Sequence, residues 1–266
     1  MSGAGPGPTA EEPPVLLTVA DGVGHVELNR PEASNTMDLG WADAFLSALE
    51  TVRDDDAVRV VLLTGRGRMF CAGGDLAAMD AAPEREPFLL ELADALHVCV
   101  RVLDALEKPV VVGVQGAAAG AGFSLVLGSD LVVAGRSAAF VTAYTSVGLT
   151  PDGGQSWLLP RTVGLQRALE LTLTPRRLGA EEAAAWGIVT KVVDDDQVQA
   201  EARALAERLA TGPAVSLGRA RRLLRSSFEA PSFSEHLDVE ARSISRTSAE
   251  PETAALIERF LSRGKG

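Results

Sequence analysis

The stretch Val111-Val-Gly-Val-Gln-Gly-Ala-Ala-Ala-Gly-Ala-Gly-Phe-Ser-Leu125 joins a β-branched run, a cluster of Gly and Ala, and an apolar continuation. This pattern predicts a buried strand that enters a loop of small residues and then an apolar helix. Small residues let a backbone approach another group closely, and the first N–H groups of a helix have no partner inside it. We therefore expect this segment to hold a negative or polarised group with its main chain.

On both sides of this segment, strand patterns alternate with helix patterns. The expected strands are 15–19, 24–28, 58–64, 109–114 and 131–134, and the expected helices are 37–53 and 88–103. A loop is expected around residues 140–155. Strands that alternate with helices are typical of an α/β core with parallel pairing.

After about residue 196 only helical spacing remains. The expected helices are 196–211, 214–228, 234–247 and 252–263, separated by Gly-Pro, Ala-Pro and Glu-Pro pairs. The chain therefore divides into a flexible N-terminal tail at 1–14, a core at 15–195 and a C-terminal helical region at 196–266. We expect the helical region to cover the core and to build an oligomer.

Composition limits the partners of this chain. A net charge of −11 argues against nucleic acid or an anionic membrane as a main partner, and no apolar run is long enough to span a bilayer. Two cysteines, Cys71 and Cys99, make no disulfide framework, which favours a reduced, cytoplasmic protein.

The glycine pattern Gly116-x-x-x-Gly120-x-Gly122 is similar to that of short-chain dehydrogenases. Those enzymes carry it after their first strand and need a downstream Tyr-x-x-x-Lys. Here it lies in mid-chain, and Gly148 stands where the lysine should follow Tyr144, the single tyrosine. A nicotinamide enzyme is therefore not favoured, and the sequence holds no phosphate-binding P-loop motif.

Nucleophile and metal motifs are equally weak. Ser124 lacks the Gly-x-Ser-x-Gly setting of a serine hydrolase. His97-x-Cys99 falls in a predicted helix without further ligands, so we expect helix packing there and no metal site. His25 lies in a strand region and is expected to be structural.

Two further motifs point to chemistry. One is Met69-Phe-Cys-Ala-Gly-Gly-Asp-Leu76, and the other is Gly148-Leu-Thr-Pro-Asp-Gly-Gly154. Alone, each could be an ordinary loop, because Pro-Asp-Gly-Gly is a turn composition. Asp152 in the second motif could instead cap a helix that opens at Gly153.

In this order, several motifs together resemble the crotonase (enoyl-CoA hydratase/isomerase) superfamily. They are Asn29-Arg-Pro31, Phe70-Cys-Ala-Gly-Gly-Asp-Leu76, Lys108-Pro109, Gly116-Ala-Ala-Ala-Gly-Ala-Gly122, Asp130, Gly148-Leu-Thr-Pro-Asp152 and Ala183-Ala-Ala-Trp-Gly-Ile-Val189. The resemblance covers about residues 15–263. It is strongest to the branch of phenylacetate-pathway epoxyacyl-CoA isomerases, which also shift Δ3 double bonds to Δ2.

The resemblance implies a spiral of ββα units with a C-terminal helical trimerisation region, and a homotrimer or a hexamer made of two trimers. It implies an acyl thioester of coenzyme A as the substrate, with no separate cofactor and no metal. The backbone N–H groups of Gly74 and Ala121 should bind the thioester oxygen, which accumulates charge when a proton leaves the acyl chain. No particular side chain is needed for that role.

The resemblance also assigns the substrate-binding residues. Coenzyme A should pass near Ala33, Ala72 and Leu76, largely against the main chain. Asp75 is expected either to tie down its loop near the coenzyme or to cap a helix. Tyr144 is expected to form a wall of the acyl pocket, and Cys71 to be packed.

The choice among crotonase reactions depends on the carboxylates. The hydratases use two glutamates, which are replaced here by Ser124 and by a residue near Tyr144. Asp152 matches the acid/base aspartate of the isomerases and the nucleophilic aspartate of a dehalogenase branch. A burial-raised pKa would let one carboxylate take a proton and return it elsewhere. Residues expected to provide apolar surroundings are Phe140, Val141, Val147, Leu149 and Trp157.

The sequence thus favours an enoyl-CoA isomerase that uses Asp152 as acid/base. A hydratase or lyase that places water through Asp152 or Ser124 stays open, as does a non-catalytic acyl-CoA-binding protein. The acyl group is not specified, so fatty-acid, aromatic and secondary metabolism are all compatible with the sequence.

Overall fold

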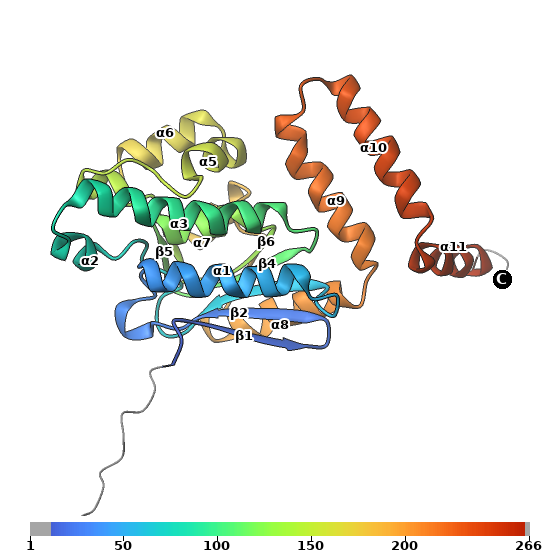
Figure 1. The fold of residues 1–266 in the computed structure, drawn as a ribbon, viewed down its shortest axis with the longest axis horizontal. Coiled ribbons are helices and arrows are strands. Elements are labelled where there is room, and N and C mark those ends of the chain that lie inside the picture. The colour runs from blue at the N-terminus through green and yellow to red at the C-terminus, as the bar shows by residue number, and fades with distance from the viewer. Residues whose placement is uncertain (1–11, 264–266) are drawn as a thin grey trace, which may run out of the picture.

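The computed structural model describes residues 12–263, in which a six-stranded sheet forms the centre (Figure 1). Its strand order is β1 (Val15–Ala20), β2 (Val23–Leu28), β3 (Val60–Gly65), β4 (Val110–Val114), β6 (Leu131–Gly135) and β9 (Lys191–Val193). β1 and β2 pair antiparallel, and every following pair is parallel. The predicted α/β class is confirmed.

Both faces of this sheet are covered, which explains why its central strands β3 and β4 are almost wholly apolar. Val61 and Leu63 of β3 face the core under α1 (Leu39–Asp54) and α3 (Arg85–Ala105). Val60 and Leu62 face the opposite side, where α8 (Val198–Ala210) packs. α8 is thus a part of the packed core, although it comes from the C-terminal helical region.

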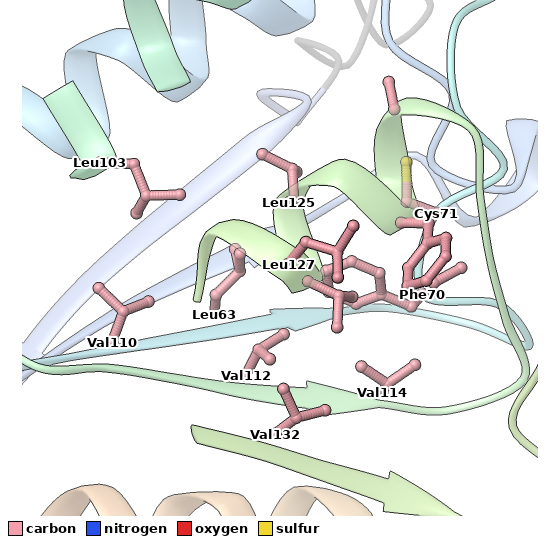
Figure 2. Close-up of a cluster of buried hydrophobic side chains, with 14 of the residues drawn as sticks. Leu63, Phe70, Cys71, Leu103, Val110, Val112, Val114, Leu125, Leu127 and Val132 are labelled. Carbon is pink, nitrogen blue, oxygen red and sulfur yellow. The ribbon is translucent and has the colours of Figure 1, made fainter. Parts of the chain in front are cut away.

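The Gly- and Ala-rich segment forms a short strand, β5 (Ala117–Ala119), and then the buried helix α4 (Ala121–Gly128). β5 belongs to a second sheet with β7 (Ala139–Val141) and β8 (Leu178–Gly179). Figure 2 shows the side chains of Val112 and Val114 on the side of β4 that faces helix α4. Helix α4 therefore lies against the six-stranded sheet, and it also contacts helices α3 and α5.

Four short helices complete the core: α2 (Leu76–Ala81), α5 (Gln155–Val163), α6 (Leu165–Leu173) and α7 (Ala180–Ala185). Part of the predicted loop at 140–155 is in fact β7 and a 3-10 turn at Tyr144–Val147. Most of these elements are too short to give a periodic signal. Of them, the sequence indicated only a helix that opens near Gly153, which is α5.

The last three helices, α9 (Ala214–Ser226), α10 (Phe233–Ser248) and α11 (Pro251–Arg263), project from the core as an arm (Figure 1). Their predicted positions are confirmed within two residues at each end. The base of the arm is fixed by Arg221, which is 7% exposed and donates to Asp130 at 2.6 Å. Arg225 donates to the other oxygen of Asp130, at 2.8 Å.

The arm carries large apolar side chains on its surface. Phe233, Ile244 and Phe260 are 79%, 72% and 78% exposed. An apolar face of this kind marks an interaction surface, while the trimer or hexamer implied by the sequence stays a prediction. Of the predicted N-terminal tail, residues 1–11 lie outside the described residues. No helix within residues 12–263 has both the length and the hydropathy needed to cross a membrane.

Candidate active site

A cavity of about 140 Å³ lies where the first turn of α4, the 72–76 turn and the middle of α3 meet. It is lined by Met37, Trp41, Ala42, Ala72, Gly73, Gly74, Asp75, Leu76, Met79, Leu89, Leu92, Ala93, Leu96, Gly120, Ala121, Ala143, Tyr144, Val147, Leu149 and Asp152. Most of these side chains are apolar. The cavity brings together seven of the eight site residues predicted from the sequence.

Two backbone turns converge at one side of this cavity. Cys71 and Ala118 form a parallel bridge, which draws the 72–74 turn against the start of α4. Gly73 has φ +101°, and a Cβ there would lie 2.9 Å from the carbonyl oxygen of Ala119. A Cβ on Gly122 would meet the carbonyl of Cys71. Glycine is required at both positions because the two backbones are in direct contact.

The convergence leaves two amides unused beside the cavity. Within residues 12–263, the N–H groups of Gly74 and Ala121 donate to no backbone or side-chain acceptor of the protein. For Ala121 this follows from its place as the first residue of α4, since its N–H has no acceptor inside the helix. A polar atom of a ligand could therefore accept from both.

Asp152 is fixed by its main chain and lines the cavity with its side chain. Its carbonyl accepts from Ser124 Oγ at 2.9 Å and from Tyr144 Oη at 3.2 Å. Helix α5 begins after Gly154 without a side-chain cap, so the carboxylate does not serve as a helix cap. The alternative role considered for Asp152 is thereby removed.

His97 of α3 contacts the Asp152 carboxylate, with 2.5 Å between Nε2 and Oδ1. The expectation that His97 would serve helix packing was wrong, whereas Cys99 two residues on is fully buried. Ala93 and His97 are four residues apart and share one stripe of the helix, but the sequence alone did not show which stripe faces the cavity. Ala93 lines the cavity, as do other residues of α3.

Asp75 caps a helix and also ties down its own loop. Oδ1 accepts from the N–H groups of Ala77 and Ala78 and caps α2, and Oδ2 accepts from Thr36 and Arg30. Burial alone would raise the pKa of Asp75, but these hydrogen bonds and the Arg30 charge outweigh it, and the net shift is downward. Asp75 is thus an engaged carboxylate at the cavity edge.

The other predicted binding residues divide into two groups. Ala72, Leu76 and Tyr144 line the cavity, whereas Ala33 lies in the 3-10 turn Pro31–Ala33 and does not. Burial raises the pKa of Tyr144, so its phenol stays protonated and donates to Asp152. Tyr144 is therefore placed as a wall that also supports the Asp152 main chain.

The expected apolar surroundings of Asp152 are only partly right. Val147 and Leu149 line the cavity, as predicted. Phe140 instead packs on Phe123 in the core, with ring centroids 5.5 Å apart, and Trp157 is a surface residue beneath the Arg161 guanidinium. Helix α3 supplies another part of the apolar wall through four residues: Leu89, Leu92, Ala93 and Leu96.

Both cysteines should be unreactive in the folded protein. Burial raises the pKa of Cys71 to about 12 and that of Cys99 to about 11, so the reactive thiolate is scarce at pH 8. We expect iodoacetamide at pH 8 to add no mass to the native protein and two carbamidomethyl groups after unfolding. Rapid labelling of the native protein, read by intact mass, would show instead that one thiol is accessible.

Within residues 12–263, no cluster of three or more His, Cys, Asp or Glu side chains has the proximity to hold a metal ion. The polar groups at the cavity are two free amides, one engaged carboxylate, one phenol, and the carboxylate of Asp152 with His97 beside it.

Known proteins share this arrangement of the chain. The sequence profile described as enoyl-CoA hydratase/isomerase matches residues 18–266. A 1,2-epoxyphenylacetyl-CoA isomerase of Escherichia coli (strain K12) is 42% identical over 228 residues, covering 85% of this chain and 87% of that one. A 4-chlorobenzoyl coenzyme A dehalogenase of an Arthrobacter species is 33% identical over 248 residues, with 91% and 88% covered.

Solved structures agree with the sequence relatives. An enoyl-CoA hydratase from Polaromonas sp. JS666 superposes with a TM-score of 0.89 at 32% identity, covering 94% of this chain and 97% of that one. Profile, relatives and fold all give the same assignment as the motifs. The chain belongs to the enoyl-CoA hydratase/isomerase family, the crotonase superfamily.

Proposed function

We propose that the protein is an enoyl-CoA isomerase in which Asp152 moves a proton along the acyl chain. The observation that carries this proposal is the placement of one available carboxylate in an apolar cavity, beside two unused amides. Asp75, the other carboxylate at the cavity, has both oxygens engaged by four donors. Asp152 is therefore the group suited to act as base.

In the proposed reaction, Gly74 and Ala121 donate their N–H groups to the thioester oxygen. Asp152 takes a proton from the carbon chain, so a C–H bond breaks and an O–H bond forms. The electron pair moves into the conjugated system, and negative charge develops on the thioester oxygen between the two amides. The carboxylic acid then returns the same proton to another carbon, and the double bond has shifted. The electron balance needs no redox partner and no cofactor beyond the thioester itself.

The cavity supports a short or compact acyl group. Its volume of about 140 Å³ is similar to that of an apolar protein cavity of about 150 Å³ that holds benzene. The E. coli relative is named for a reaction of an epoxyphenylacetyl thioester of coenzyme A. An acyl group about as large as phenylacetyl would fit in this cavity. We place coenzyme A along the Ala72–Leu76 turn, which lines the cavity.

A substrate panel tests the proposal. Purified protein is incubated separately with 3-hexenoyl-CoA, with crotonyl-CoA and with a ring-epoxide phenylacetyl-CoA, and products are identified by mass and chromatography. Conversion of 3-hexenoyl-CoA to the 2-enoyl product supports the isomerase. Hydration of crotonyl-CoA without migration of the first substrate supports a hydratase, and binding without any turnover supports an acyl-CoA-binding protein.

One of these alternatives is weakened by the geometry. In the hydratase hypothesis, Ser124 is one of two residues that could place the water molecule. Ser124 is 2% exposed, its hydroxyl donates to the Asp152 carbonyl, and it does not line the cavity. Water placement would therefore depend on Asp152 alone among those two residues.

The contact between His97 and Asp152 favours hydrolytic dehalogenation of an aryl-CoA as a second candidate. In that reaction Asp152 would displace halide from an activated ring carbon, and His97 would take a proton from the water that cleaves the resulting ester. The Arthrobacter relative is named for a reaction of this class. Adding 4-chlorobenzoyl-CoA to the panel decides it, because chloride release would be detected directly.

A further inference from the structure

We propose that His97 is a positioning residue for Asp152: its Nε2–H holds Oδ1, so that Oδ2 is the oxygen that exchanges the proton with the acyl chain. This inference rests on the proposed isomerase function and adds to it the division of labour between the two carboxylate oxygens. It starts from the 2.5 Å contact between Nε2 and Oδ1, which joins two segments 55 residues apart in the chain.

The first step is an inventory of what holds Asp152. Three groups bind its carbonyl oxygen: Ser124 Oγ, Tyr144 Oη and the N–H of Gln155. None of them touches the carboxylate. Within residues 12–263, His97 is the one hydrogen-bond partner of that carboxylate. The main chain is thus fixed independently, and the orientation of the side chain depends on the imidazole.

The second step concerns room to move. The side chains of Asp152 and His97 are 30% and 34% exposed, so neither is locked by close packing on all sides. A carboxylate without its partner could rotate about χ1 and χ2 toward water. His97 is carried by the long helix α3, whose Leu96 and Cys99 are buried in the core, so the backbone that bears the imidazole is fixed.

The third step assigns the proton. A carboxylate that acts as a base is an acceptor only, so the ring nitrogen facing Oδ1 must carry the hydrogen. After Oδ2 has taken a proton from the substrate, Oδ1 still accepts from the same N–H. The hydrogen bond therefore persists through both halves of the reaction. No proton needs to pass between His97 and Asp152, and the carboxylate keeps one orientation while it takes and returns its proton.

The test compares two variants with helix-forming side chains of similar length. His97→Gln retains an amide N–H that can reach Oδ1, and His97→Met removes the donor. We expect His97→Met to lower kcat for double-bond migration by about 10²-fold, the typical cost of a small misplacement of reacting groups. KM should change less than about twofold, and His97→Gln should recover most of the lost kcat.

Two controls separate this inference from others. The melting temperature and the affinity for saturated hexanoyl-CoA should be the same in both variants, because a structural role would move them together with kcat. Wild-type kcat in His97→Met, or equal losses in the two variants, would overturn the inference. If Asp152→Asn is inactive while His97→Met turns over normally, only the role of His97 fails; full activity of Asp152→Asn would refute the isomerase mechanism itself.

Discussion

Replacing Asp152 by Asn is expected to slow double-bond migration severely while acyl-CoA binding is retained. The amide has nearly the shape of the carboxylate, and its oxygen can still accept from His97 at the place of Oδ1. It cannot take up a proton, however. A positioned acid/base group contributes about 10²–10⁴-fold to the rate of proton transfer, and we expect a loss of kcat in that range.

The measurement is kcat with 3-hexenoyl-CoA, together with the affinity for hexanoyl-CoA by calorimetry. A matched control is Asp94→Asn, since Asp94 is an exposed carboxylate on the same helix as His97 and lies outside the cavity. Its kcat should equal that of the wild type. If Asp152→Asn kept its kcat within a factor of three, another group would have to be the base.

Removal of the Ala121 N–H alone should be almost as damaging. Because this donor belongs to the backbone, side-chain substitution cannot delete it; replacement of Ala121 by lactic acid changes the amide into an ester of similar shape. Loss of one oxyanion donor in other enzymes lowers kcat by about 10²–10³-fold. We expect a decrease of that size, with little change in the affinity for a saturated acyl-CoA.

A suitable control exists in the same chain. Ala214 is the first residue of α9, as Ala121 is of α4, and it lies far from the cavity residues. Each ester also weakens the preceding carbonyl as a hydrogen-bond acceptor. For the Ala121 ester this is the Gly120 carbonyl, which accepts from Ser124 N; for the Ala214 ester it is the Pro213 carbonyl, which accepts from Leu217 N. An Ala214 ester should turn over normally. Equal kcat values for the two esters would show that Ala121 does not bind the thioester oxygen.

The main elements and half of the site were accessible from the sequence, because they depend on local rules. The Gly- and Ala-rich segment predicted close backbone approach, and the structure places that approach between the 72–74 turn and the start of α4. The long amphipathic helices were found from their periodicity. Each of these patterns can be recognised within about twenty consecutive residues.

The remainder depends on contacts that only the folded chain creates. His97 is a single histidine in an otherwise ordinary helix, and its significance comes from Asp152, which is 55 residues away. Trp157 was expected to contribute to the apolar surroundings of Asp152, but it lies on α5 at the surface. The C-terminal helices were expected to cover the core, and α8 does so through alanines such as Ala202 and Ala206. The sequence did not distinguish α8 from α9, α10 and α11, which project from the core (Figure 1).

The cavity takes its two free amides from glycine-dependent turns and much of its wall from the side chains of α3. The turns tolerate almost no substitution, since an added methyl group at Gly73 or Gly122 would collide with backbone. Leu89, Leu92 and Ala93 carry no such restriction. Substitutions on α3 can therefore enlarge or reshape the cavity while the two amides that would bind the thioester oxygen stay in place. A scaffold of this kind can accept new acyl groups without rebuilding its thioester site.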